Sequence, residues 1–370
     1  MSVLAPLPFM HLTPGPDEAA IRAGLDRVIR RGWFILGPEL AAFEDEFAAA
    51  CGAAHAVGVN TGTDAIALAL RALGIGPGDE VITSPLSAAY SALAIMMAGA
   101  TPVFADLDED RLTLDPAKVD AAVTPRTAAI LPVHLYGQAA DMVGIEAIAR
   151  RHNLAIVEDA CQAHLATANG RPVGTIGAAG AFSFYPTKNL GALGDAGAII
   201  TNDAALAEKL KRLRNGGQTA KYHHVEFGVN SRLDEMQAAV LRARLPFLAA
   251  WTTRRRELAA RYREALVDSP VIVPPERDPG HVYHLFPVRS AQRDAFQAHL
   301  REQGIETLIH FPVPIPKQPA MVDLPASSCP IADQVCDEVF SLPLHHALND
   351  SDVDRVAASV HEFRASAAGR

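Results

Sequence analysis

Cysteine is scarce in this sequence of 370 residues, and the four cysteines show no close paired spacing. They are Cys51, Cys161, Cys329 and Cys336. This number and spacing argue against a scaffold held together by disulfides and favour a reducing compartment, so we expect a cytoplasmic protein. A basic segment followed by an apolar run is also missing near residue 1, so we expect no secretory signal peptide.

Blocks of basic residues are nearly absent too. The net charge is -9, and Arg254–Arg256 is the one local basic cluster, which we interpret as the solvated face of a helix. This balance argues against a nucleic-acid partner. Val81–Ala105 has no charged residue and is long enough to suggest a membrane span, but it contains two prolines and a glycine. We therefore expect a strand, a buried helix and a second strand there, and no membrane partner.

Recognised metal and hydrolase motifs are missing as well. The sequence has 14 histidines, but none of the close pairs has a known zinc spacing, so we expect no metal. The pairs are Cys161 with His164, His223 with His224, His281 with His284, and His345 with His346. A Gly-x-Ser-x-Gly elbow does not occur, which makes a triad hydrolase a poor fit.

Alternation of short β-rich runs with helix-like segments dominates residues 55–201. It predicts an α/β fold with a mostly parallel sheet and helices on both faces. The expected strands are 55–59, 80–83, 101–105, 127–133, 154–158, 179–184 and 196–201; the expected helices include 64–73, 203–213 and 233–265, the last broken near Pro246. A proline-rich stretch at 270–279 precedes a strand at 282–288 and helices at 293–303 and 331–340. We expect a large domain over 1–250 and a smaller α/β domain over 251–370.

A lysine and an acid stand at the ends of two of the expected strands. Lys188 lies in Ser183–Asn189, a segment poor in charge, and Asp159 closes the strand Ala155–Asp159. Ligands of such sheets bind outside the carboxyl ends of the strands. Pyridoxal phosphate needs an amine that can form a Schiff base with its aldehyde and an anion that keeps its pyridine nitrogen protonated. A solvated lysine and a helix cap or structural salt bridge for Asp159 remain the alternatives.

Several smaller signals fit an anionic cofactor at the same edge. Asn60–Asp64 joins a strand to a helix, where Gly62 lets the backbone approach an anion and Thr63 offers a hydroxyl, although an ordinary helix cap fits equally well. The Ser183 hydroxyl is a candidate phosphate ligand, and Gln162 is a candidate donor to the phenolic oxygen of the cofactor. Glu158 is expected to face the opposite side of the sheet.

Together these motifs resemble the DegT-type sugar aminotransferases, which are fold-type I pyridoxal phosphate enzymes that act on nucleotide-linked keto-sugars. The resemblance runs over nearly the whole length. Its motifs are Gly37–Glu39, Asn60–Ala65, His134–Gln138, Glu158–His164, the Lys188 segment, Gly228–Glu235 and His310–Pro314.

The resemblance implies roles for particular residues. Lys188 would hold the cofactor, Asp159 would pair with its pyridine nitrogen and Gln162 would touch its ring hydroxyl. The phosphate ligands would be Gly62, Thr63 and Ser183, with Asn230 reaching the phosphate of the neighbouring subunit, which implies a homodimer with shared sites. The sugar-nucleotide pocket would be shaped by side chains near Tyr185, Lys221, Tyr222 and His310.

One position departs from the family pattern. Relatives usually place an aromatic residue over the cofactor ring, directly after a Thr or Ser in the turn that follows the second strand. Here Ser87 is followed by Ala88, and the nearest aromatic residue is Tyr90. Either Tyr90 substitutes from the next turn, or aliphatic contacts cover the ring.

The expected function is a two-stage transamination with pyridoxal phosphate as cofactor. Glutamate would donate the amino group to a nucleotide-linked keto-sugar, and the segment around Lys188 most resembles enzymes that aminate C3 of a dTDP-3-keto-6-deoxyhexose. Arg232 is a candidate for the donor carboxylate, because guanidinium binds carboxylates bidentately, or else an interface salt bridge. The alternatives are a sugar dehydratase of the same fold, whose relatives carry histidine at the position of Lys188, and a regulatory protein that binds the cofactor without turnover.

Overall fold

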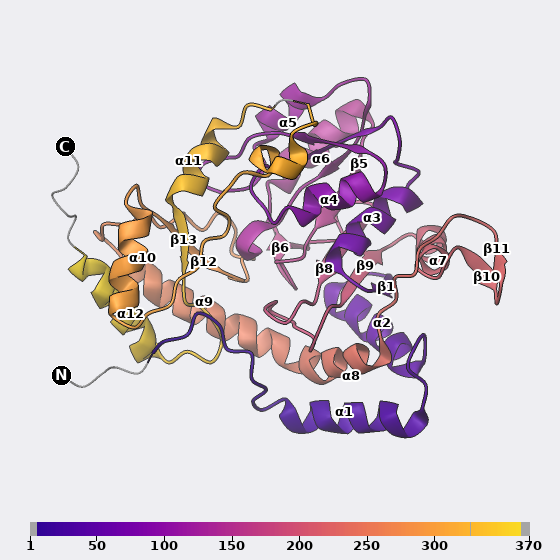
Figure 1. Ribbon diagram of the computed structural model, residues 1–370, viewed down its shortest axis with the longest axis horizontal. Coiled ribbons are helices and arrows are strands. Elements are labelled where there is room, and N and C mark those ends of the chain that lie inside the picture. Colours follow the sequence, from indigo (N-terminus) through magenta and orange to yellow (C-terminus); the bar gives the residue numbers. More distant parts are fainter. Residues whose placement is uncertain (1–5, 326, 364–370) are drawn as a thin grey trace.

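The computed structural model describes residues 6–325 and 327–363, and its architecture is α/β, as predicted (Figure 1). A seven-stranded sheet has the order β1-β9-β8-β5-β4-β2-β3. Its strands are β1 (His55–Val59), β2 (Glu80–Thr83), β3 (Thr101–Phe104), β4 (Thr127–Leu131), β5 (Ala155–Asp159), β8 (Ala179–Ser183) and β9 (Gly197–Thr201). The predicted strands are confirmed, with ends that differ by one or two residues.

One strand, β9, runs against its two neighbours, and the other pairs in the sheet are parallel. The first residue of β9, Gly197, pairs with Ser183 at the end of β8 and with Val59 at the end of β1. The carboxyl ends of β1 and β8 therefore meet at the same edge of the sheet as the end of β5. This edge is where ligands bind in open α/β sheets.

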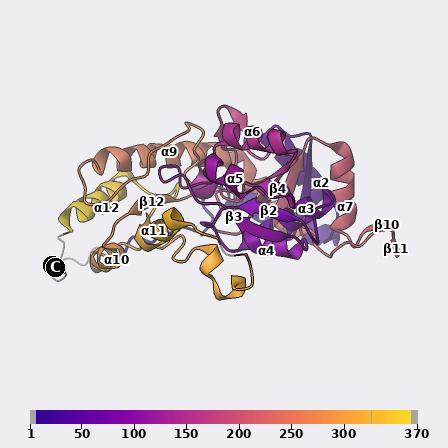
Figure 2. The same cartoon turned by 90° about the horizontal axis from the view of Figure 1, so that it is seen from above.

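Helices cover both faces of the sheet. Side chains of α2 (Pro38–Cys51), α5 (Pro116–Ala122), α6 (Met142–His152) and α8 (Glu235–Arg244) pack in one apolar cluster. The second cluster contains side chains of α3 (Gly62–Ala72), α4 (Tyr90–Met97) and α7 (Ala204–Leu213). Figure 2 shows α5 and α6 on one side of β2 and β3, and α4 on the other. The strand, helix and strand predicted within residues 81–105 are β2, α4 and β3.

The strands supply both clusters because successive side chains of a strand point to opposite faces. Ile82 and Ile130 belong to the first cluster, whereas Val81 and Leu131 belong to the second. Strands buried on both faces read as continuous apolar runs, which explains why the sequence shows β-rich runs rather than alternating polar residues.

The C-terminal part has its own apolar core. The antiparallel strands β12 (Phe286–Arg289) and β13 (Val339–Leu342) pack with α10 (Arg293–Glu302), α11 (Pro330–Glu338) and α12 (Asp350–Glu362). The long helix α9 (Leu248–Ala265) contacts both regions, since Leu248 lies in the first cluster of the large sheet and Tyr262 in the C-terminal core. A domain boundary at residues 250 and 251 stays a prediction; it would fall in the first turn of this helix.

Two predictions for this part were wrong in detail. The strand expected over 282–288 begins only at Phe286, because residues 282–285 turn sharply and Tyr283 has a φ of 46°. The helix expected over 331–340 ends at Glu338, and the next residues form β13, whose Phe340 is buried in the C-terminal core. The break predicted near Pro246 is present as a short 3-10 turn, Leu245–Phe247, between α8 and α9.

The remaining described elements are one helix, two short strand pairs and three 3-10 turns. They are α1 (Glu18–Arg31), the short pairs β6 (Thr167–Ala168) with β7 (Arg171–Pro172) and β10 (Gln218–Ala220) with β11 (His223–His224), and the 3-10 turns Leu135–Gly137, Ile315–Lys317 and Pro319–Met321. The β10–β11 pair projects beyond α7 at one end of the molecule (Figure 1). No helix within the described ranges combines the length and apolar character needed to cross a bilayer.

Candidate active site

The N-terminus of α3 forms one wall of the candidate site. The Thr61 hydroxyl caps this helix by accepting a hydrogen bond from the Asp64 N–H at 3.0 Å. The backbone N–H groups of Gly62 and Thr63 come next, in the first turn, where an α-helix has no partner for them. The helix cap that the sequence allowed as an equal alternative is therefore present. It coexists with free backbone N–H donors that suit an anion.

A close fit at Gly62 brings this helix against two other predicted residues. A β-carbon at Gly62 would lie 2.7 Å from Cys161 Sγ and 2.8 Å from Ser183 Cβ. Only glycine permits this approach without a shift of the neighbours. The helix N-terminus and the Ser183 hydroxyl thus lie side by side, as expected for residues that bind one anion.

Asp159 is buried at the end of β5, with 5% of its surface exposed. Its Oδ2 accepts a hydrogen bond from the Ser91 hydroxyl at 2.7 Å, and its Oδ1 accepts one from the Cys161 N–H at 3.1 Å. The Ser87 hydroxyl lies 3.1 Å from that of Ser91. Within the described residues no cation forms an ion pair with Asp159, so a buried carboxylate is left for a positively charged ligand.

The neighbouring acid, Glu158, has a different place, on the opposite face of β5 as predicted. Its carboxylate accepts hydrogen bonds from His134 Nε2 at 3.0 Å and from three backbone N–H groups, those of Gly174, Ile176 and Gly177. These donors satisfy the buried charge. Glu158 therefore joins the end of β5 to the segment before β8 and faces away from the site.

Gln162 is buried with its amide held in one orientation. Its Oε1 accepts a hydrogen bond from the Tyr136 N–H at 2.7 Å. The amide N–H groups are consequently directed elsewhere and remain donors, which is the property that binding to a phenolic oxygen requires.

Lys188 lies in the loop after β8, where its backbone N–H donates to the Tyr185 carbonyl at 2.8 Å. Burial lowers the pKa of its amine, while the charges of Cys161 and Asp159 act in the opposite direction. A lysine with a lowered pKa has a larger neutral fraction, and the neutral amine is the form that is both nucleophilic and basic.

Three histidines interact electrostatically with this amine, and their lowered pKa values keep them neutral. Burial, followed by the charge of Lys188, lowers the pKa of His164 to about 3 and that of His310 to about 4. The same two causes lower the pKa of His284 well below its usual value. The ring of His164 packs against Phe182 and Phe184, and both of its nitrogens lack a hydrogen-bond partner among the described residues. Lys188 therefore has no competing cation among these three side chains.

A cavity of about 380 Å³ lies beside Lys188. The N-terminal segment forms one side of it. The loop after β8, which carries Lys188, and residues of α8, α9 and the turn after β13 form the other sides. The lining is Met10–Thr13, Gly15–Asp17, Pro186–Asn189, Gly191, Arg244, Trp251, Arg255 and His345–Ala347.

The predicted substrate residues are only partly brought together. His310 faces the charge of Lys188, and Tyr185 is half-exposed in the same loop as the lysine. Arg232 donates a hydrogen bond to Asn215 Oδ1 at 3.3 Å, and Lys221 and Tyr222 lie on the projecting arm between β10 and β11. None of Arg232, Lys221 or Tyr222 lines the cavity beside Lys188.

Asn230, Ala88 and Tyr90 are exposed or half-exposed in the single chain. Ala88 and Tyr90 are the residues considered above for covering the cofactor ring. Asn230 pairs with Asn215 through an isolated β-bridge next to the projecting arm. Ala88 is half-buried, and Tyr90 begins α4 with 64% of its surface exposed. The two explanations for the ring face both stay predictions.

Sequence reasoning missed two residues of this site, Ser91 and Arg255. The buried Ser91 beside Asp159 gave no signal beyond its place in an uncharged stretch. Arg255 was interpreted as solvated, which is wrong, because it is buried on the inner face of α9. The spacing of Leu248, Thr252, Arg255, Ala259 and Tyr262, alternately four and three residues, was the available signal.

The fold and this site together define a class of protein. A mostly parallel sheet flanked by helices, with a half-buried lysine, a buried acid and a helix N-terminus at its carboxyl edge, is the architecture of fold-type I pyridoxal phosphate transferases.

Comparison with known proteins agrees with this class. Residues 17–361 match the DegT/DnrJ/EryC1/StrS aminotransferase family, and the chain belongs to that family. The resemblance inferred from the motifs is thereby confirmed, as is the class of enzyme, an aminotransferase.

Individual relatives and solved structures are close over nearly the full length. A dTDP-3-amino-3,4,6-trideoxy-alpha-D-glucose transaminase of Streptomyces venezuelae is 50% identical over 96% of this chain and 96% of its own. A dTDP-3-amino-3,6-dideoxy-alpha-D-galactopyranose transaminase of Aneurinibacillus thermoaerophilus is 48% identical over 94% and 96%. The crystal structure of S. venezuelae DesV in complex with a ketimine intermediate superposes with a TM-score of 0.93, at 49% identity, over 97% of this chain and 98% of that one.

Proposed function

We propose that this protein is a pyridoxal phosphate-dependent aminotransferase that transfers the amino group of glutamate to C3 of a dTDP-linked 3-keto-6-deoxyhexose. The proposal rests first on the juxtaposition of Lys188 with Asp159 and the N-terminus of α3. The substrate class follows the two relatives named above, both of which are transaminases of dTDP-linked 3-amino sugars.

The residues present fit the cofactor. A β-carbon at Gly62 would fill the space beside Ser183, so this glycine leaves the first turn of α3 open to a phosphate. The N–H groups of Gly62 and Thr63 and the hydroxyls of Thr63 and Ser183 would hold that phosphate. Asp159 would accept a hydrogen bond from the protonated ring nitrogen, and Gln162 would donate one to the ring hydroxyl.

Pyridoxal phosphate, when bound, supplies an electron-accepting ring that stabilises negative charge on the carbon next to the transferred nitrogen. Lys188 has two roles in the proposal. Its amine would hold the cofactor; once released by the donor amine, it would take the proton from the α-carbon of glutamate and hold it for return within the same half-reaction. The lowered pKa of Lys188 favours the neutral amine that removes the proton.

The buried carboxylate of Asp159 provides the fixed negative charge. Its hydrogen bonds from Ser91 and Cys161 keep both oxygens oriented, so the charge does not have to reorganise during the reaction. The same residues would then carry out the steps in reverse order on the keto-sugar. Tyr185 and His310 are the proposed pocket residues nearest the lysine, and Arg232 is the proposed ligand of the donor carboxylate.

Addition of glutamate to the purified, cofactor-loaded protein tests this function. We expect the visible absorbance of the bound cofactor to bleach, with release of 2-oxoglutarate, and to return when a dTDP-3-keto-6-deoxyhexose is added. Mass spectrometry of a panel of keto-sugar nucleotides identifies the amino-sugar product and its nucleotide. A band that ignores amino acids would instead favour a regulatory, cofactor-binding protein, and loss of a sugar hydroxyl without amination would favour a dehydratase.

A homodimer with shared sites is part of the proposal. The arm around β10 and β11 exposes large apolar side chains, with Tyr222 at 83% and Phe227 at 84% exposure, and Asn230 lies beside it. Exposed apolar surface of this kind suits a protein partner. A second copy would cover the arm, and Asn230, Lys221 and Tyr222 would then reach the neighbouring site. The four cysteines are unpaired, which agrees with the reducing, cytoplasmic setting that we also propose.

Complementation between two inactive variants tests the shared site. Asn230→Asp places a negative charge where the phosphate of the other subunit is proposed to bind, and Lys188→Ala removes the amine. Mixed and re-associated chains are expected to recover roughly a quarter of wild-type activity, since random pairing makes half of the dimers mixed and each has one intact site. No recovery in a mixture whose dimers are shown by mass to have exchanged would contradict shared sites; each variant alone serves as the control.

A further inference from the structure

Arg255 is a buried cation without an anionic partner. It is 4% exposed, and its Nη1 donates to the carbonyl oxygens of Tyr283 at 3.2 Å, His284 at 3.4 Å and Leu344 at 2.8 Å. Among the described residues no carboxylate forms an ion pair with it, and its Nε has no hydrogen-bond partner. Burial lowers its pKa to about 10. An arginine placed in this way is costly, so an apolar side chain of similar size would serve packing alone better.

The backbone that Arg255 holds packs against the loop that orients Gln162. The Val282 N–H donates to the Gly137 carbonyl at 3.0 Å, and the Leu285 N–H donates to the Tyr136 carbonyl at 3.3 Å. The fit is tight, because a β-carbon at Gly137 would lie 2.9 Å from the backbone nitrogen of His284. The Tyr136 N–H in turn binds Gln162 Oε1.

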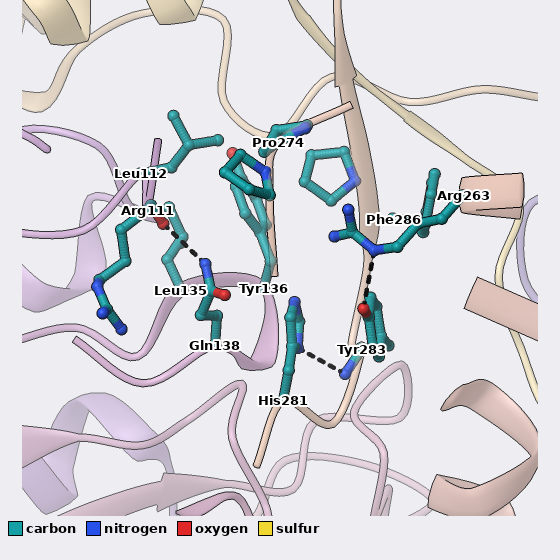
Figure 3. Close-up of a pocket in the computed structure, with 12 residues that line it drawn as sticks. Arg111, Leu112, Leu135, Tyr136, Gln138, Arg263, Pro274, His281, Tyr283 and Phe286 are labelled. Atoms are coloured by element: carbon teal, nitrogen blue, oxygen red, sulfur yellow. Dashed lines mark hydrogen bonds between the residues drawn. The ribbon is translucent and has the colours of Figure 1, made fainter. Parts of the chain in front are cut away.

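Figure 3 shows the two sides of this contact around a small cavity. Tyr136 and Gln138 approach from one side, and His281 and Tyr283 approach from the other. The volume of the cavity is about 20 Å³, enough for roughly one water molecule. This junction is therefore closely packed, and a displacement of residues 282–285 would be passed to the Tyr136 loop.

The same backbone also binds the residue that follows the lysine. Asn189 Nδ2 donates to the Val282 carbonyl at 3.1 Å. His284 Nδ1 lies 3.2 Å from Asn189 Oδ1, and because a carbonyl oxygen only accepts, the neutral His284 ring carries its proton on Nδ1. Asn189 is buried between these two contacts, so residues 282–284 fix the loop in which Lys188 lies.

We propose that Arg255 is a positioning residue for the transamination, which holds residues 283 and 284 so that Asn189 keeps Lys188, and Tyr136 keeps Gln162, in place around the cofactor. The inference rests on the proposed function. In this role Arg255 acts through a segment that contacts both sides of the site, and not directly on the reacting atoms. Misplacement of a reacting group by about 1 Å costs on the order of 10²-fold in rate, so even a small displacement of this segment is measurable.

Arg255→Met is the decisive variant, and Arg256→Met is its matched control. Methionine removes the charge and the donors while keeping an unbranched chain. Arg256, the next residue on α9, donates its Nε to the His281 carbonyl at 2.8 Å but is exposed and does not bind residues 283 or 284. Melting temperature, bound cofactor per chain and the rate of bleaching by glutamate, expressed per bound cofactor, are measured for both variants and the wild type.

We expect Arg255→Met to lower the rate per bound cofactor roughly tenfold or more, with a smaller effect on the KM for the sugar, and Arg256→Met to match the wild type. Equal rates per bound cofactor in all three proteins would overturn the inference, whatever the melting temperatures, because a purely structural role changes only the amount of loaded protein. If Arg255→Met does not fold, Arg255→Lys and Asn189→Ala replace it: the proposal requires both to slow the reaction, and the double variant to be no slower than the slower single one. A wild-type protein whose band ignores glutamate would instead refute the proposed function.

Discussion

Replacement of Lys188 by alanine is expected to remove transamination almost completely, with a loss in rate of at least about 10³-fold in both half-reactions. The variant loses the amine that is proposed both to hold the cofactor and to move the proton. His164, His284 and His310 are poor replacements for this base, because burial lowers their pKa values. The measurement is the rate of 2-oxoglutarate formation from glutamate, followed by the rate of amino-sugar formation.

The fold of this variant should be preserved, because the Lys188 amine makes no hydrogen bond or ion pair with the described residues while its alkyl chain lines a cavity. Circular dichroism and the melting temperature check this. Lys211→Ala, which removes an exposed amine paired with Glu208 on α7, is the matched control and is expected to retain full activity. Turnover by Lys188→Ala within tenfold of the wild type would exclude the lysine from the proposed mechanism.

The architecture was largely predictable because its physical signals are local. Strands buried on both faces produce short apolar runs, and most of the helices between them are followed within two residues by glycine or asparagine, so the alternation was visible over residues 55–201. The segment at 81–105 was identified as strand, helix and strand by its prolines and its glycine rather than by apolar content alone. The antiparallel direction of β9 was not predictable, since strand direction depends on the path of residues 184–196 and leaves no mark on the strand itself.

The C-terminal part was harder to predict, because there too the path of the backbone leaves no mark on the local sequence. Val282 and Leu285 have the residue types of a strand, yet their backbone groups bind Gly137 and Tyr136 instead of a neighbouring strand. Arg255 was misinterpreted because a triple arginine normally indicates a solvated surface. Only the folded chain brings the carbonyl oxygens of Tyr283, His284 and Leu344 to α9, where they accept the hydrogen bonds that make its burial possible.

The site was predictable in its chemistry but not in its surroundings. Asp159 and Lys188 could be recognised from their positions after strands, because the carboxyl ends of parallel strands converge. The Ser91 hydroxyl that binds Asp159 comes from a helix 68 positions earlier in the chain, so no spacing rule points to it. The sequence could predict which of Asp159 and Glu158 faces the site, since adjacent residues of a strand face opposite sides.

Substitution can separate the roles of Asp159 and Glu158. Asp159→Asn should lower the rate of the glutamate half-reaction by on the order of 10²-fold or more, because it removes the fixed charge that is proposed to pair with the ring nitrogen. Its fold should be nearly unaffected. The asparagine oxygen can accept from the Cys161 N–H, and its amide can donate to the Ser91 hydroxyl, which rotates to accept. Stopped-flow bleaching of the visible band, together with the dissociation constant of the cofactor, measures the loss.

Glu158→Gln should give the opposite pattern and serves as the comparison. The Glu158 carboxylate accepts four hydrogen bonds, three of them from backbone N–H groups that cannot reverse their direction. An amide –NH₂ turned toward such donors leaves buried groups unsatisfied, so we expect a loss of at least about 2 kcal/mol in the free energy of unfolding. The rate per bound cofactor should change far less than in Asp159→Asn. If instead Asp159→Asn reacted as fast as the wild type, or Glu158→Gln were the slower of the two per bound cofactor, the negative charge that the chemistry needs would not be that of Asp159.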